Sequence, residues 1–171
     1  QKEPRVVFVF TGQGAQYPNM GYDMYQNNSI FRGILQECDE ILNDYMPYPL
    51  IQTLYESDDS SYMNDPAFAQ PALFAVEYAL SCVVQNHLGS EPFAVVGHSL
   101  GEFAAMCMAR MLSLSEACTL VAARGKAMSK LLSSGDSMGS MAAVWASETE
   151  VASILSSMTD SDAVIGVVNS P

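Results

Sequence analysis

Short, continuous apolar runs alternate along the chain with longer stretches whose apolar residues recur at helical spacing. The short runs are rich in β-branched and aromatic residues and predict strands. The first, RVVFVF, is typical of a strand buried on both faces of a parallel sheet. The predicted strands cover residues 5–10, 93–96, 141–146 and 163–168.

The stretches between these strands predict helices, two of which carry explicit start signals. Ser113 with Glu116 forms a capping box, and Ser147 is an N-cap residue. The predicted helices are a weak one over 22–46, one from near Pro71 to Gly89, one from the GHSLG turn to about Met111, one over 113–132, and one after Ser147. The acidic segment 55–65 is expected to be an exposed loop, and SGDSMGS (134–140) a linker. The order of elements indicates an α/β core followed by the start of a second sheet.

Composition and charge narrow the functions open to this chain. Its 171 residues suit one domain, or one domain and a piece of another, and 49% of them are apolar. The net charge of −12 argues against binding to nucleic acid or to an anionic membrane, although one well-placed cation could still bind an anionic substrate. No apolar run approaches the roughly 20 residues of a membrane span. The chain begins at Gln1 and has no signal peptide, so we expect a segment of a longer cytoplasmic protein.

The four cysteines show no CxxC spacing, and the chain has only two histidines. These numbers do not support a zinc site. We expect Cys38, Cys82, Cys107 and Cys118 to be reduced core thiols in a reducing compartment.

The glycine-rich segment TGQGAQY (11–17) follows the first predicted strand. A dinucleotide-binding loop is excluded because Tyr17 occupies the third glycine position, and a phosphate-binding loop because no Gly-Lys-Ser/Thr follows. Two interpretations remain. Either the glycines present the Gln13 amide at the carboxyl edge of the sheet, or Gln13 is a solvated residue in a tight turn.

GHSLG (97–101) matches the G-x-S-x-G strand-to-helix turn that exposes a nucleophilic serine. Small residues on either side allow backbone to pass closely, and the following helix directs N–H groups, Leu100 first, at an oxyanion. Ser99 is therefore a nucleophile or an ordinary turn hydroxyl. His98 is adjacent and diverges at such a turn, and His87 lies at a predicted helix end. The residues offer no credible base.

Together, FTGQGAQ, QPAL, GHSLGEFAA and AARGKAM resemble the malonyl-CoA:acyl-carrier-protein acyltransferase family, which includes acyltransferase domains of polyketide and fatty acid synthases. The resemblance implies an α/β fold with a parallel-sheet, α/β-hydrolase-like core over 1–137. It also implies that 138–171 is the first, incomplete βαβ unit of a small ferredoxin-like subdomain.

The resemblance also implies a ping-pong mechanism. Ser99 accepts a malonyl group from malonyl-CoA and passes it to the phosphopantetheine thiol of an acyl carrier protein. Gln13 and the Leu100 N–H line the oxyanion hole, and Arg124 holds the free carboxylate, which suits a planar guanidinium. Gln70 borders the pocket, and Leu100 resembles the malonyl-selective form of the motif.

No bound cofactor is expected, and the implied partners are the carrier protein, a ketosynthase and other domains of the same synthase. The family's catalytic histidine is expected beyond Pro171. Without the resemblance, Arg124 would be interpreted as a solvated cation beside Lys126 and Lys130. Two alternatives share the serine turn: a serine hydrolase of the α/β-hydrolase or patatin type, and a non-catalytic acyltransferase-like fragment.

Overall fold

The computed structural model describes residues 5–133, 142–158 and 162–168. The chain divides into two compact units, Gln1–Asp136 and Ser137–Pro171. Each unit is described by itself. The predicted linker 134–140 lies outside the described residues.

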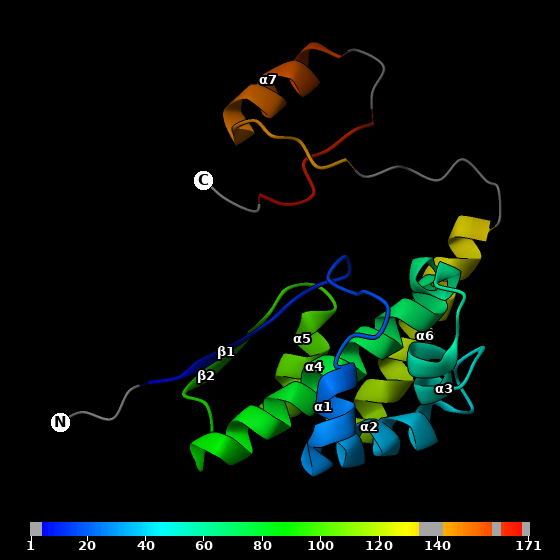
Figure 1. The fold of residues 1–171 in the computed structure, drawn as a ribbon. Helices are drawn as coiled ribbons and strands as arrows, with labels where there is room; N and C mark the ends of the chain where they lie inside the picture. The colour runs from blue at the N-terminus through cyan, green and yellow to red at the C-terminus, as the bar shows by residue number, and fades with distance from the viewer. Residues whose placement is uncertain (1–4, 134–141, 159–161, 169–171) are drawn as a thin grey trace. The chain divides into compact units, whose positions relative to one another are not determined.

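The first unit places two parallel strands among helices (Figure 1). Its elements are β1 (Val7–Phe10), α1 (Tyr22–Asn27), α2 (Ser29–Leu42), α3 (Leu50–Glu56), the 3-10 helix η1 (Ser61–Asn64), α4 (Pro66–Leu88), β2 (Ala94–Gly97), α5 (Gly101–Met108) and α6 (Leu114–Ser133). β1 and β2 pair in parallel, with Val7 opposite Ala94 and Phe10 opposite Gly97. Because both strands end at the same edge, the loops that follow Phe10 and Gly97 start side by side.

The two faces of β1 differ in burial. Phe8 and Phe10 belong to the core, whereas Val7 and Val9 are 46% and 73% exposed. The prediction of a strand buried on both faces is therefore wrong within the described residues. The reason is that the helices supply core contacts to only one set of alternating side chains.

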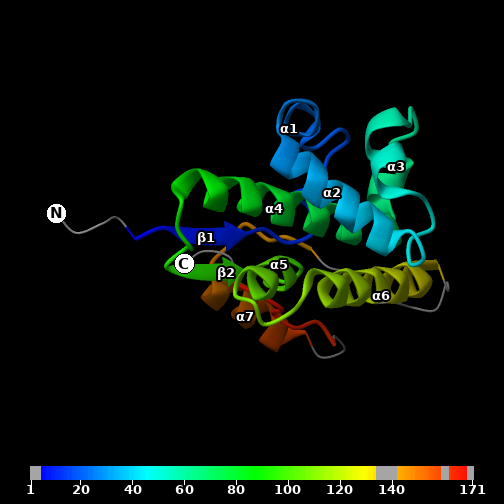
Figure 2. The ribbon, with the colours of Figure 1, turned by 90° about the horizontal axis from the view of Figure 1, so that it is seen from below.

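α4 is the central helix, and it packs along α6 and against α2 and α5 (Figure 2). It begins at Pro66, not near Pro71, because the Asp65 side chain accepts a hydrogen bond from the Ala67 N–H and Pro66 occupies the first turn. Pro71 lies inside the helix, and Gly89 ends it with a φ of 66°. By length and composition α4 could cross a membrane, so the expectation that no apolar run approaches the length of a membrane span is corrected. However, 67% of its most apolar stretch is buried inside the protein, as expected of a core helix.

Two other sequence expectations are corrected in the first unit. Residues 22–46 form two helices because Asn28 is extended, and its side chain caps α2 by accepting from the N–H groups of Ile30 and Phe31. The segment 55–65 is not wholly an exposed loop, because Tyr62 and Met63 of η1 are buried. The capping box of Ser113 and Glu116 is confirmed at the start of α6.

The second unit contains α7 (Glu148–Ser157), which begins at the predicted N-cap residue Ser147, and the structure adds that Ser147 and Glu150 form a capping box. The strand predictions at its two ends are wrong for the described residues, since 142–146 and 163–168 are in no strand. A strand is formed only as one side of a hydrogen-bonded ladder, and the ladder among the described residues joins β1 and β2. Met141 lies outside the described residues. The ferredoxin-like arrangement stays a prediction.

Candidate active site

Ser99 occupies a strained turn between β2 and α5. Its φ is +53°, in the left-handed region that residues other than glycine rarely adopt. This conformation costs a residue with a Cβ about 1–2 kcal/mol. Strain of this kind concentrates at functional sites, and it exposes the Ser99 hydroxyl beyond the end of β2.

The glycines on either side of Ser99 are required by close backbone contacts. A Cβ at Gly97 would lie 2.3 Å from the Glu102 nitrogen, and one at Gly101 would lie 2.4 Å from the Thr11 carbonyl oxygen. Both distances are far below van der Waals contact. The G-x-S-x-G spacing therefore packs the serine turn directly against the loop that follows β1.

That loop carries Gln13 toward the serine turn. Gly12 lies against His98, because a Cβ there would be 2.8 Å from the His98 Nδ1. Gly14 has a φ of +117°, and its N–H donates to the Gln16 Oε1 at 2.7 Å. The two glycines thus serve different purposes: Gly12 permits close approach, and Gly14 permits a turn.

A hydrogen-bonded network joins the predicted site residues. The Arg124 Nη2 donates to the Ser99 Oγ at 3.1 Å, and the Arg124 Nη1 donates to the Gln70 Oε1 at 2.6 Å. The Gln70 Nε2 donates in turn to the Gln13 Oε1 at 2.9 Å. The serine turn, α6, α4 and the loop after β1 contribute one residue each, so the structure brings Ser99, Arg124 and Gln13 together.

Gln70 connects Arg124 to Gln13 in this network, a role that the sequence did not reveal. Its side chain is completely buried, and both ends of its amide are used. The start of α4, where Gln70 lies, is pressed against α6 because Gly125 has no side chain. A Cβ there would be 2.5 Å from the Pro66 carbonyl oxygen. The glycine beside Arg124 therefore allows the two helices to approach closely enough for Arg124 to reach Gln70.

No carboxylate of the described residues forms an ion pair with Arg124. Within residues 5–133, 142–158 and 162–168, the ion pair that forms is Arg110 with Glu91, at the surface. The recorded partners of Arg124 are neutral, and its side chain is half-buried. A guanidinium in this state can bind an anion beside the Ser99 hydroxyl.

Leu100 is the N-cap residue of α5, and its side chain is fully buried. Backbone N–H groups in the first turn of a helix have no partner inside the helix, and the helix dipole favours negative charge there. Because Gln70 donates to the Gln13 Oε1, this bond leaves the Gln13 amide nitrogen available as a donor. Both groups can stabilise an oxyanion.

Neither histidine hydrogen-bonds to Ser99 in the described part of the chain. The partner of the Ser99 Oγ there is Arg124, while His98 is exposed against Gly12 and His87 is exposed in the last turn of α4.

The four cysteines are free, and Cys38, Cys107 and Cys118 are buried. No group of three His, Cys, Asp or Glu side chains suited to a metal gathers among the described residues.

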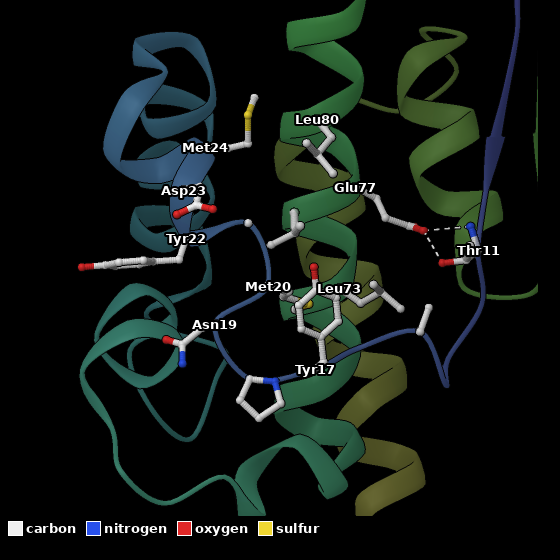
Figure 3. A pocket seen from close by; sticks show the side chains of 14 residues that line it. Thr11, Tyr17, Asn19, Met20, Tyr22, Asp23, Met24, Leu73, Glu77 and Leu80 are labelled. Carbon is white, nitrogen blue, oxygen red and sulfur yellow. Dashed lines mark hydrogen bonds between the residues drawn. The ribbon is translucent and has the colours of Figure 1, made fainter.

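A cavity of about 720 Å³ lies between the segment 11–24 and α4 (Figure 3). It is lined by neither Ser99 nor Arg124. The candidate active site is therefore defined by the hydrogen-bonded network and the strained turn rather than by this cavity.

Comparison with known proteins assigns the family. Residues 7–171 match the family model of the acyl transferase domain. The chain belongs to the acyl transferase family. Over 171 residues this acyltransferase chain is 36% identical to polyketide synthase GfsA of Streptomyces halstedii, covering 98% of the chain and 2% of GfsA.

Solved acyltransferase structures show the same fold. The acyl transferase domain of ZmaA matches with a TM-score of 0.70 and 35% identity, over 76% of this chain and 31% of that one. A malonyl-transacylase in complex with its type II polyketide synthase acyl carrier protein matches with a TM-score of 0.66 and 30% identity, over 74% of this chain and 40% of that one. The acyltransferase chain thus spans well under half the length of these relatives.

Proposed function

We propose that Ser99 is the nucleophile of an acyltransferase that takes a malonyl group from malonyl-CoA and loads it onto an acyl carrier protein. The observation that carries this proposal is the hydrogen bond between Ser99 and Arg124, whose charge no described carboxylate balances. A serine hydrolase needs the strained serine turn but has no use for such a cation beside it.

The reaction divides into two acyl transfers. In the first, the Ser99 Oγ attacks the thioester carbonyl, its proton goes to a general base, and the C–S bond breaks to release CoA. In the second, the phosphopantetheine thiol gives its proton to the same base, its sulfur attacks the acyl-serine ester, and the C–O bond breaks as Ser99 regains a proton from the base. The Leu100 N–H and Gln13 stabilise the oxyanion in both, an effect worth about 10²–10³ in rate per donor.

The general base is proposed to be a histidine outside residues 1–171. Support comes from the described residues, in which His87 and His98 make no hydrogen bond with Ser99. General-base assistance contributes about 10²–10⁴ in rate, so the chain needs such a partner for turnover.

Arg124 is proposed to select short diacids. In a malonyl thioester the free carboxylate is separated from the attacked carbonyl by one methylene. A cation that already contacts the nucleophilic oxygen is therefore well placed to bind that carboxylate. Preference for malonyl over methylmalonyl rests on the resemblance at Leu100.

The wider setting is also proposed. An acyl carrier protein is the acceptor, as the complex of the related malonyl-transacylase suggests, and ketosynthase and other synthase domains accompany this one in the cytoplasm. We further propose a hydrolase-like core over 1–137 and a ferredoxin-like subdomain beginning at 138. The segments 142–146 and 163–168 would become strands of that subdomain once they are paired.

The test is a comparison of acceptors. The full protein that carries this chain is incubated with malonyl-CoA in water alone and with a holo acyl carrier protein, and CoA release and carrier mass are followed. The proposal predicts that malonyl-CoA in water releases a single equivalent of CoA per enzyme, and that the carrier is needed for continued CoA release and becomes malonylated. Equal CoA release without the carrier would identify a hydrolase, and no release in either case would identify a non-catalytic domain.

A further inference from the structure

Glu77 is the single acidic residue of the long apolar helix α4. Its Oε1 accepts two hydrogen bonds from Thr11, one from the backbone N–H at 2.8 Å and one from the Oγ1 at 2.6 Å (Figure 3). Thr11 is the first residue after β1 and lies two residues before Gln13. A side chain from the middle of α4 thus holds the start of the loop that carries Gln13.

The same helix also holds the loop at Gln13. Gln70 and Glu77 are seven residues apart, which places them on one face of α4, two turns from each other. Gln70 binds Gln13, and Glu77 binds Thr11. Further along the loop, the Gln16 amide donates to the Met63 carbonyl oxygen at 3.3 Å. The path of the loop across α4 is therefore set by named contacts rather than by its own turn alone.

Thr11 is also part of the packing behind the nucleophile. Its carbonyl oxygen is the atom that a Cβ at Gly101 would meet, directly after the serine turn. A displacement of Thr11 would therefore change how the Gln13 loop and the Ser99 turn face each other.

The other carboxylate oxygen of Glu77 differs from the first in its hydrogen bonding. The Oε2 is buried and has no hydrogen-bond partner in the described residues. Burial raises the pKa of Glu77, although the two bonds from Thr11 act in the opposite direction. Burying a carboxyl group with one unsatisfied oxygen is unfavourable, so the presence of Glu77 in α4 is better explained by its other oxygen, which holds Thr11 in position.

We propose that Glu77 is a positioning residue for acyl transfer, which acts through Thr11 to set the Gln13 loop opposite Ser99. The proposal rests on the proposed function, because it assigns Gln13 to the oxyanion. Glu77 itself touches neither Ser99 nor Arg124 in the recorded hydrogen bonds.

The experiment uses the full protein and measures Ser99 acylation by malonyl-CoA under single-turnover conditions. Glu77→Ala should lower the saturating rate by up to about 100-fold with little change in the concentration of malonyl-CoA that gives half the maximal rate, since misplacement by 1 Å has effects of that size. Glu77→Gln keeps an acceptor oxygen and should restore most of the rate. Ser81→Ala, which removes a buried hydroxyl one turn along α4 that bonds the Tyr78 carbonyl, is the matched control and should leave the rate unchanged.

A double-mutant cycle with Gln13→Ala separates positioning from general destabilisation. If Glu77 acts through Gln13, Glu77→Ala should change the rate by less than about twofold once Gln13 is gone. The proposal would be overturned if the rate losses of Glu77→Ala and Gln13→Ala multiplied in the double variant, or if Glu77→Gln were as slow as Glu77→Ala.

Amide hydrogen exchange tests the same proposal without chemistry. Glu77→Ala should speed exchange at Thr11–Gln13 and leave α6 unaffected, while unchanged exchange in the loop would overturn the proposal. If the unmodified protein fails to acylate Ser99, the proposed function fails, and this exchange result still decides whether Glu77 holds the loop.

Discussion

Replacing Ser99 by glycine or by alanine should separate the strain of the serine turn from its chemistry. Both substitutions remove the hydroxyl that accepts from Arg124, so that loss is common to the two variants. They differ in the Cβ, which at a φ of +53° costs about 1–2 kcal/mol in folded alanine and almost nothing in glycine. Glycine gives back about 0.4–1 kcal/mol through the greater freedom of its unfolded chain. The Ser99→Gly variant should therefore be more stable than Ser99→Ala, by about 0.8 kcal/mol at the middle of these ranges.

Thermal unfolding of the acyltransferase domain measures this difference. At roughly 2–4 °C per kcal/mol in a domain of 150–250 residues, this gain corresponds to about 2–3 °C in melting temperature. Both variants should be inactive in acylation, so the more stable variant has also lost function. A Ser99→Ala variant as stable as Ser99→Gly or more so would mean that Ser99 is not held in the left-handed conformation, and the serine turn described above would be wrong.

Three further substitutions test other parts of the site. Arg124→Ala should lower malonyl transfer by roughly 10- to 150-fold, which corresponds to the loss of a charge-assisted contact worth about 1.5–3 kcal/mol, and should spare acetyl transfer. Arg110→Ala removes an equal charge at the surface and is the control. Equal losses of malonyl and acetyl transfer in Arg124→Ala would mean that Arg124 has a structural role. Gly125→Ala should push α6 away from α4 and lower malonyl transfer, because Arg124 would lose its contact with Gln70. The separation of the helices should appear as faster amide hydrogen exchange at the start of α4, and unchanged exchange there would contradict the close packing at Gly125. Burial raises the pKa of Glu77 above its usual 4.5, so the stability that the protonated side chain contributes is present below pH 4.5 and is lost as the pH rises through the raised pKa. Glu77→Gln should remove this part of the pH dependence of urea unfolding, and an unchanged pH profile would show that burial does not raise the pKa of Glu77.

Local signals in the sequence predicted the helix starts well. The capping boxes of Ser113 with Glu116 and of Ser147 with Glu150 are formed within four residues, so no distant partner is needed. The start of α4 was missed because two prolines, Pro66 and Pro71, both suit a first turn. Asp65 decides between them, because its side chain caps the helix that begins at Pro66.

Features that depend on distant partners could not be read from the residues alone. The exposure of Val9 and the absence of strands at 142–146 and 163–168 depend on which segments pair or pack, and apolar composition is the same in either case. Within the site, the G-x-S-x-G motif identified Ser99 as a candidate nucleophile, and the resemblance assigned the roles of Gln13 and Arg124. The link through Gln70 required the close packing of α6 against α4 at Gly125.

Glu77 carries a signal that is visible in the sequence. A lone carboxylate in a 23-residue apolar helix is costly to bury without a partner, and this alone marks it for attention. What the sequence could not give is the partner, because Thr11 lies 66 residues away.

Mapping the acyl group tests the central claim most directly. The full protein is treated with malonyl-CoA, quenched, digested and analysed by peptide mass. We predict a malonyl adduct on the peptide that contains Ser99, and its complete loss in Ser99→Ala. An adduct on another nucleophile such as Cys107, or one that persists in Ser99→Ala, would contradict the assignment of Ser99 as the nucleophile.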